Sequence, residues 1–343
     1  MKNLVLTFSL FLLVSFSFAQ KTVAVLSGST WTFYDDFSPA LRVAPSGSTI
    51  YLPGGTFDLG GSDTINKPLT IIGVGFRTDS TLATGKTTLT GSLNFATGGN
   101  NVNLIGFELS NFISTLSLND VENINIQRCK VNGVIYLENG SNRINNIKIS
   151  ECVLLGNVIG SSSEKVDNII VENSIVADYL IGIKGGIFRN NVFSINSVAL
   201  DNCDNSEFYN NIFLLANTII AFSSFSSSYC TFVNNLFVTG YSQSSGLGSS
   251  PLFISNITGA SFAIFENVQG YAYSQTYDYH LKSTSPGKNA GTDGTDIGIY
   301  GTAYPYKEGA VPPNPHISTK SIAPTSAANG TLPVNIKVVA QDR

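Results

Sequence analysis

The chain has 343 residues, of which 43% are hydrophobic and only 12% are charged, and its formal net charge is −4 at pH 7. Ordinary soluble domains carry about 25% charged residues, so Asn, Ser, Thr and Gly must supply much of the polar surface here. With 19 basic against 23 acidic residues, the chain lacks the excess of Lys and Arg that binding to phosphate backbones requires. We therefore expect no nucleic acid among its partners.

The first twenty residues have the pattern of a secretory signal peptide. Lys2 supplies a short basic start, an apolar run follows, and Ser17-Phe18-Ala19 forms a small-x-small cleavage site. We predict that residues 1–19 are a signal peptide and that the product is exported, to the extracellular space, the cell surface or the periplasm. No later segment of the sequence reaches about 18 consecutive apolar residues, so we expect no direct membrane insertion.

A short apolar phrase with a polar turn at its centre recurs along the middle of the chain, at a spacing of roughly 17 to 24 residues. Within each copy, β-branched residues alternate with polar ones and are interrupted by Asn, Gly and Ser, which is typical of short strands. A second strand follows in most copies, as at 134–137, 179–183, 198–200 and 218–222. The phrase begins at Leu104, Ile126, Ile149, Val171, Phe188, Phe208 and Phe232.

Several strands per repeat without a crossover helix predict the fold class, an all-β protein built as a right-handed parallel β-helix solenoid. We expect about ten rungs, stacked about 4.8 Å apart, with like residues forming columns. One polar column is expected at the turns, where Asn tolerates a left-handed conformation and its amide bonds from rung to rung. Its members are Phe107, Cys129, Cys152, Ser174, Asn191, Asn211 and Asn235.

The two ends of the chain differ from the repeats. Residues 36–44 are predicted to form a capping helix with Ser38 as N-cap and Pro39 in the first position. The predicted β-helix domain covers residues 20–301, and residues 302–343 form a Pro/Gly linker followed by a C-terminal β-hairpin extension. The hairpin strands are expected at 316–323 and 332–339, and this tail is a candidate contact for a surface-anchoring partner.

The rungs also carry a resemblance to a known family. Gly47 to Thr56, with Asn66 to Gly75, resembles the opening rungs of secreted right-handed parallel β-helix proteins of the pectin-lyase-like superfamily. Asp278 to Pro286, Asn289 to Gly291 and Thr295 to Gly301 resemble the closing rungs of many bacterial members, and the tail resembles C-terminal extensions of such proteins in Bacteroidota. Together the resemblance covers about residues 40 to 301, and its motifs mark caps and turns, not chemistry.

The resemblance implies that acidic glycans are candidate substrates. Polysaccharide lyases on this fold typically use Ca²⁺ held by carboxylates, with an Arg or Lys as base, whereas the galacturonan hydrolases use closely placed Asp residues. No pair of Asp residues lies on the repeat strands, which argues against the hydrolase. The lyase reading assigns Arg128, Lys148 and Arg189 as candidate bases and Glu151, Glu172 and Glu207 as candidate metal ligands. No cofactor is expected otherwise.

A structural reading of the same charges is favoured. Arg128 and Glu151, and likewise Glu172 and Arg189, fall in shared outward columns on adjacent rungs, where opposite charges form stabilising cross-strand pairs. Aromatic rings are candidates for stacking on sugar rings, and we assign that role to Tyr209, Tyr271 and Tyr273. Trp31 is expected to pack within the cap.

Two features stay open at this level. Five apolar residues fall where the register points outward, and we expect the C-terminal hairpin or a partner to cover them, because a bare apolar stripe is costly in water. The four cysteines, Cys129, Cys152, Cys203 and Cys230, are either paired in disulfides or buried as small apolar groups. The apolar stripe consists of Val153, Ile175, Val192, Ile212 and Leu236.

Three functions are compatible with these features. The leading hypothesis is an exported β-helix protein that binds or presents polysaccharide at or beyond the cell surface. The first alternative is a Ca²⁺-dependent polysaccharide lyase acting on acidic glycans, and the second is a structural or adhesive surface rod. A lyase requires a base and carboxylates converging in one groove, whereas binding requires only a regular polar face.

Overall fold

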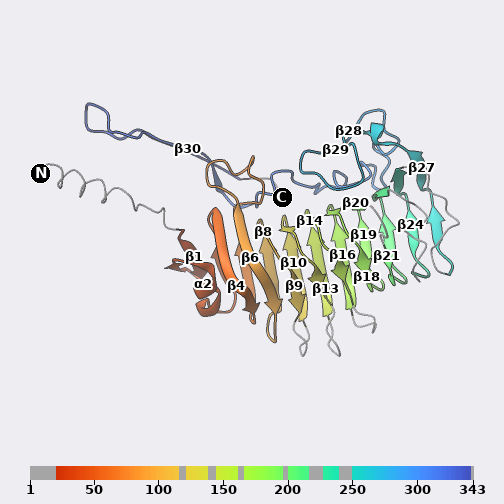
Figure 1. The fold of residues 1–343 in the computed structure, drawn as a ribbon, viewed down its shortest axis with the longest axis horizontal. Coiled ribbons are helices and arrows are strands. Elements are labelled where there is room, and N and C mark those ends of the chain that lie inside the picture. Colours follow the sequence, from red (N-terminus) through yellow and green to blue (C-terminus); the bar gives the residue numbers. More distant parts are fainter. Residues whose placement is uncertain are drawn as a thin grey trace, which may run out of the picture.

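The computed structural model describes residues 21–115, 121–137, 144–160, 166–195, 200–215, 227–238 and 249–340. Short strands from successive turns of the chain stack side by side into a rod (Figure 1). The predicted fold class is confirmed, since the strands form two long sheets whose repeat-to-repeat pairings are parallel. The segments 1–19, 218–222 and most of 198–200, to which we assigned a signal peptide and two strands, lie outside the described residues.

The first sheet has 12 strands and forms one face of the rod. Ten of these strands, from β3 to β26, run parallel, and β1 and β2 add an antiparallel hairpin at the N-terminal end. In sheet order the strands are β2 (Thr30–Tyr34), β1 (Val23–Ser27), β3 (Ser48–Tyr51), β5 (Leu69–Ile72), β7 (Val102–Ile105), β10 (Val121–Gln127), β13 (Ile144–Ser150), β16 (Val166–Glu172), β19 (Ile187–Arg189), β22 (Glu207–Tyr209), β24 (Thr231–Val233) and β26 (Leu252–Ile254).

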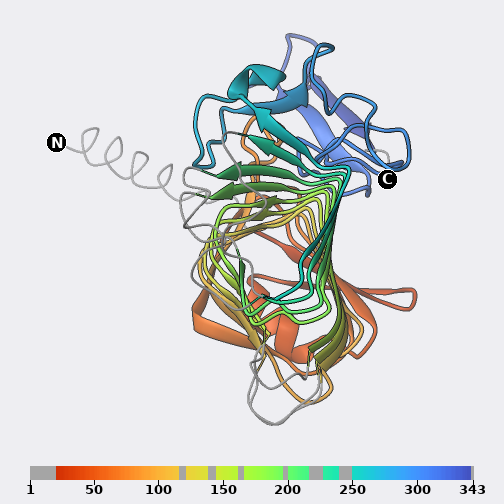
Figure 2. The same cartoon turned by 90° about the vertical axis from the view of Figure 1, so that its right-hand side faces the viewer.

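The second sheet has 15 strands, and it wraps around the other sides of the rod (Figure 2). Its strands are mostly two to four residues long, because each turn bends sharply between them. They are β4 (Gly55–Ile65), β6 (Thr87–Phe95), β8 (Glu108–Leu109), β9 (Ile113–Thr115), β11 (Lys130–Val131), β12 (Ile135–Tyr136), β14 (Val153–Leu154), β15 (Val158–Ile159), β17 (Ile175–Val176), β18 (Leu180–Ile181), β20 (Val192–Ile195), β21 (Leu200–Asp201), β23 (Ile212–Leu215), β25 (Leu236–Val238) and β27 (Ile257–Ala260).

Columns of like residues fill the interior, as the repeat predicts. In register, Ile126 pairs with Ile149 and Ile149 with Val171. Further along, the rings of Phe188 and Phe208 stack with centroids 4.9 Å apart, and Phe208 stacks on Phe232 at 4.7 Å. Ring separations this close to the strand spacing show that one register is kept from rung to rung.

The polar turn column forms the expected hydrogen-bonded ladder. The backbone N–H of Asn191 donates to Oδ1 of Asn211 at 2.9 Å, and the N–H of Asn211 donates to Oδ1 of Asn235 at 2.8 Å. The amide of Asn211 also donates to the carbonyl of Phe188 at 2.8 Å. One expectation is corrected: the left-handed conformation belongs to the residue before each ladder position, as at Asn210 with φ 53°.

The N-terminal end of the rod is closed by a short helix, as predicted. Helix α2 (Phe37–Val43) buries Phe37, Ala40 and Leu41. Its N-cap is Asp36, whose carboxylate accepts a hydrogen bond from the N–H of Phe37 at 2.8 Å. The predicted cap, Ser38, instead lies inside the first turn and donates its hydroxyl to Asp63.

Residues 262–311 fold back along the outside of the rod and form a cover, which Figures 1 and 2 show above the second sheet. The cover contains the 3₁₀ helix η1 (Phe262–Ile264) and the strands β28 (Phe265–Asn267) and β29 (Asp278–Leu281), which pair with each other. Residues 278–301 are therefore not closing rungs, although they resemble them in sequence. The rungs of the described chain end with β26 and β27.

The outward apolar stripe lies beneath this cover. Val153, Val192 and Leu236 are fully buried, and they pack in one cluster with Ile299 and Tyr306 of the cover. The prediction that the stripe is covered is confirmed, but the hairpin is the wrong element. Strands β30 (His316–Ile322) and β31 (Val334–Val339) form the predicted C-terminal hairpin, and most of its side chains are exposed.

All four cysteines are unpaired and buried. Burial raises the pKa of the Cys129 thiol to about 12, so it stays protonated and packs as an apolar group. The open choice between disulfides and buried thiols is therefore settled in favour of thiols. Within the described residues, no helix is long and apolar enough to cross a membrane.

We expect Asn211→Ala to lower the free energy of unfolding by about 3 kcal/mol or more, because it removes the side-chain partner of two buried backbone groups, the N–H of Asn191 and the carbonyl of Phe188, at about 1–3 kcal/mol each. Denaturant unfolding of both proteins measures the difference. Asn125→Ala is the matched control, since Asn125 lies on the outer face and makes one bond of 3.3 Å to Asn103. Equal losses from the two variants would contradict a structural role for the ladder.

Candidate functional site

A groove runs along the outer face of the first sheet. It lies beside residues 299–313, the end of the cover and the two residues after it, which we call the C-terminal segment. The groove consists of two adjoining hollows of about 570 and 440 Å³, which share Lys148, Glu172, Asn173 and Tyr304. We call these two hollows the central groove. Its floor and walls are Asn103, Ile105, Asn125, Gln127, Arg128, Lys148, Ser150, Glu151, Glu172, Asn173, Arg189, Asn190, Tyr209, Asn210, Thr292, Asp293, Thr302, Ala303, Tyr304 and Pro313.

At the centre of this groove, one carboxylate lies between two cations. Nζ of Lys148 is 2.6 Å from Oε1 of Glu172, and the guanidinium of Arg189 contacts Oε2 through Nη2 at 2.6 Å and Nε at 2.8 Å. Strand register explains the arrangement, because Glu172 of β16 pairs directly with Arg189 of β19. The expected cross-strand pair is present, and Lys148 extends it to a triad.

In this triad the two cationic side chains are about half exposed, whereas the carboxylate side chain is mostly buried. The side chain of Glu172 is 14% exposed, whereas those of Lys148 and Arg189 are 49% and 48% exposed. Burial tends to raise the pKa of Glu172, but hydrogen bonds and charge from Lys148 and Arg189 outweigh it and hold the pKa below 4.5. The carboxylate is therefore ionised at neutral pH, and the groups that this triad presents to the groove are positive.

Tyr209 continues the same outward column beside Arg189. Its hydroxyl donates to Oε2 of Glu207 at 2.9 Å. Burial, followed by the hydrogen bond and charge of Glu207, raises the pKa of Tyr209, so the phenol stays protonated at neutral pH. Tyr209 thus lines the groove with an aromatic ring whose hydroxyl is held by Glu207.

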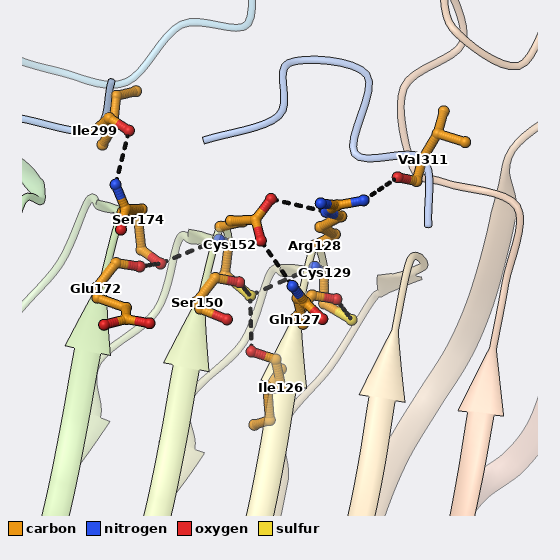
Figure 3. Close-up of polar contacts among 12 residues, drawn as sticks. Ile126, Gln127, Arg128, Cys129, Ser150, Cys152, Glu172, Ser174, Ile299 and Val311 are labelled. Atoms are coloured by element: carbon orange, nitrogen blue, oxygen red, sulfur yellow. Dashed lines mark hydrogen bonds and ion pairs between the residues drawn. The ribbon is translucent and has the colours of Figure 1, made fainter. Parts of the chain in front are cut away.

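Arg128 and Glu151 pair as expected, but they are not at the surface. Arg128 is fully buried, and its Nε lies 2.7 Å from Oε2 of Glu151, whose Oε1 accepts from Gln127 at 2.7 Å (Figure 3). Nη1 of Arg128 donates to the carbonyl of Val311 at 2.8 Å. The C-terminal segment buries this pair, which corrects the outward placement and leaves Arg128 unsuited to act as a base.

Arg128 belongs to a seam that fixes the wall of the groove. Like Asn173, it has a positive φ at the turn before the ladder, and from there its side chain extends toward the C-terminal segment. Nδ2 of Asn173 donates to the carbonyls of Ile299 and Gly301 at 3.0 and 3.1 Å. The turn residues therefore hold residues 299–311 against the rod.

The three glutamates proposed as metal ligands do not gather at one point. Glu151 bonds Arg128 and Gln127, Glu172 bonds Lys148 and Arg189, and Glu207 accepts from Tyr209. Their carboxylates therefore neutralise or bond neighbouring side chains. The cluster of metal-binding side chains found among the described residues lies elsewhere, at Asp278, His280 and Glu308.

The other proposed sugar contacts lie outside the central groove. Tyr271 and Tyr273 belong to the cover and pack against its apolar cluster, with the ring of Tyr271 4.8 Å from that of Phe262. Conversely, Tyr304 lines the groove with 64% of its surface exposed, and the sequence analysis did not single it out. It lies in the Pro/Gly linker, where no repeat predicts which way a residue faces.

We expect Glu172→Gln to destabilise the protein at neutral pH by about 1 kcal/mol, because two cations lose their shared anion. The folded pKa of Glu172 lies below 4.5, so its stabilisation is present above that pH and is lost as pH falls through the folded value. Unfolding at pH 7 and about pH 2 measures this, with the exposed Glu266→Gln as control. An equal difference at both pH values would contradict the ion triad.

Comparisons with known proteins give little guidance. No family matches the chain, and none of the curated proteins matches it. Among the solved structures that match, one is described as an alginate lyase from Paenibacillus sp. str. FPU-7; it has 14% identity and a TM-score of 0.23, and the match covers 65% of this chain and 96% of that chain. At that identity and TM-score, the likeness says nothing about what this chain binds.

Proposed function

We propose that this protein binds an acidic polysaccharide, laid along the central groove in an extended conformation. The observation that carries the proposal is the triad, in which Lys148 and Arg189 share the charge of Glu172 and still expose about half of each side chain. Two cations against one carboxylate leave the triad with one net positive charge beside the groove, which is also lined by the exposed carboxylate of Asp293. A uronate carboxylate is the group that such a pair of donors recognises.

Neutral polar side chains beside the triad suit sugar hydroxyls. Asn103, Asn125, Gln127 and Ser150 line the same groove and come from three successive strands, β7, β10 and β13. Strand pairing holds these three strands about 4.8 Å apart along the rod. Because these donors and acceptors are preorganised on a rigid sheet, the protein loses little conformational entropy when a glycan binds.

The predicted export fits this role. Acidic polysaccharides occur outside cells, and the N-terminal residues have the composition of a secretory signal peptide. We therefore place the protein at or beyond the cell surface, with polysaccharide as its partner and the hairpin available to an anchoring partner.

Substitution of the exposed cations tests the proposal. We expect Lys148→Ala and Arg189→Ala each to weaken binding of polygalacturonate about tenfold or more, since a hydrogen bond to a charged group contributes about 1.5–3 kcal/mol. Affinity electrophoresis or calorimetry measures the loss, which grows smaller at high salt. Lys337→Ala, an exposed lysine on β31, is the control and keeps full affinity. Undiminished binding in the double variant would rule out the groove.

A uronate lyase is the second candidate, because Lys148, Arg189 and Tyr209 line one groove. In that reaction a base removes the proton on the carbon beside the carboxylate, and the electrons expel the glycosidic oxygen as a double bond forms. The raised pKa of Tyr209 and the ion pairs of both cations with Glu172 disfavour each as a base.

Ultraviolet absorbance distinguishes binding from cleavage. We expect incubation with pectic, alginate and neutral polysaccharides, with and without Ca²⁺, to yield bound acidic glycan but no unsaturated uronate ends. Absorbance that grows with time and is lost in Arg189→Ala would replace the binding role with a lyase. Neither binding nor product would favour the structural rod.

A further inference from the structure

A third hollow, of about 630 Å³, lies at the N-terminal end of the rod. We call it the terminal hollow, and it is lined mostly by apolar groups from the β1–β2 hairpin, from β3 and β5, and from the start of the C-terminal hairpin. Its lining residues are Thr22, Ala24, Trp31, Tyr51, Leu52, Pro53, Gly54, Ile72, Gly73, Val74, Ala83, Thr84, Pro312, Asn314, Pro315, His316, Ile317 and Lys320.

The terminal hollow continues the line of the central groove. A column of outward residues, each paired with the next on the neighbouring strand, connects the terminal hollow to the central groove. The part between the hollows runs from Tyr51 to Tyr209. Eight strands make up this part, and seven spacings of about 4.8 Å give a length of about 34 Å. In register the column reads Tyr51, Ile72, Ile105, Gln127, Ser150, Glu172, Arg189 and Tyr209.

The opposite wall is also continuous. Pro312 lines the terminal hollow, and its neighbour Pro313 lines the central groove together with Tyr304. This segment is fixed to the rod where Nη1 of Arg128 donates to the carbonyl of Val311. The same seam thus positions the wall of both hollows, and a glycan lying in the groove would meet the terminal hollow next.

The chemistry of the column changes along this line. Tyr51, Ile72 and Ile105 are aromatic or aliphatic, whereas the residues from Gln127 onward are polar or charged. Beside Tyr51 lies Trp31, with ring centroids 5.6 Å apart and planes inclined by 36°. Trp31 is 50% exposed, so it is not packed within the cap as the sequence predicted. An exposed indole beside a phenol ring is a rigid apolar platform.

Polar groups lie at the edge of this platform. Asn314, His316 and Lys320 line the hollow from the C-terminal side. Nδ1 of His316 is buried and has no hydrogen-bond partner among the described residues. An apolar platform with polar groups at one side matches a sugar ring, whose C–H face is apolar and whose hydroxyls extend from the ring edge.

We propose that Trp31 and Tyr51 form a terminal subsite that stacks against one sugar ring of the same acidic polysaccharide. This inference rests on the proposed function and extends it, because it gives the bound polysaccharide a second contact of a different chemical kind. Cations hold a uronate at Lys148 and Arg189, and Tyr51 of the aromatic pair lies four strands from Lys148 and six from Arg189, about 19 and 29 Å along the rod. Only an oligosaccharide long enough to span that distance engages both.

The sequence supplies a built-in reporter, because Trp31 is the only tryptophan in the chain. We expect a galacturonate decamer to shift the Trp31 emission and to protect it from acrylamide quenching. A galacturonate dimer, at a concentration that saturates the central groove by calorimetry, leaves the emission unchanged. The double variant Lys148→Ala, Arg189→Ala binds the decamer weakly and loses most of the emission change.

Affinities of platform variants complete the test. We expect Trp31→Ala and Tyr51→Ala each to weaken decamer binding about threefold to tenfold, the loss expected for one aromatic stacking contact, without changing dimer binding. Trp31→Phe keeps most of the affinity because it keeps a ring. Tyr229→Ala is the control, since Tyr229 is 59% exposed and lines neither hollow.

The outcomes separate the two proposals. Calorimetric binding of the decamer with unchanged Trp31 emission and full affinity in Trp31→Ala would refute the terminal subsite while the central groove stands. A loss of affinity in Trp31→Phe equal to that in Trp31→Ala would also refute stacking. If neither oligomer binds the wild-type chain, the proposed function and the subsite both fail.

Discussion

In-register stacking of parallel strands about 4.8 Å apart is the constraint on which the rest of this structure depends. It places like residues in columns, so buried Asn side chains bond from rung to rung and Phe rings stack at 4.7 to 4.9 Å. The same register sets the outer face. Glu172 reaches Arg189 because their strands pair at those positions. The same strand register therefore sets both the interior columns and the ion pair on the outer face, and a change of register would disrupt both.

The C-terminal end of the cover lies beside the outer face of the first sheet, and together they form a groove. A sheet exterior alone offers a glycan only one side. Residues 299–311 add the second side, and Arg128 and Asn173 hold them there from turn positions with positive φ. The segment also buries the outward apolar stripe through Ile299 and Tyr306, so the apolar contact that stabilises the cover also builds the groove wall.

The two cross-strand ion pairs, Arg128 with Glu151 and Glu172 with Arg189, differ in burial for this reason. The pair of Arg128 with Glu151 lies under the C-terminal segment, where its hydrogen bonds are satisfied within the protein and it positions backbone. Glu172 and Arg189 are instead the last residues of β16 and β19, one position before the turn residues that lie under that segment, so the cations of Lys148 and Arg189 remain accessible. Burial by a distant segment, and not residue type, separates the buried charges from those accessible to a ligand.

The repeat pattern was enough to predict the β-helix, its ladder, its interior columns and the pairing of Glu172 with Arg189, because a repeat of fixed phase specifies which residues become neighbours. It did not determine what covers the outward stripe, since residues 278–301 resemble rungs and yet lie outside them. Tertiary structure alone brought Tyr304 and Pro312 to the groove and left Trp31 exposed. Those placements arise from contacts between segments far apart in the chain, and no local periodicity encodes them.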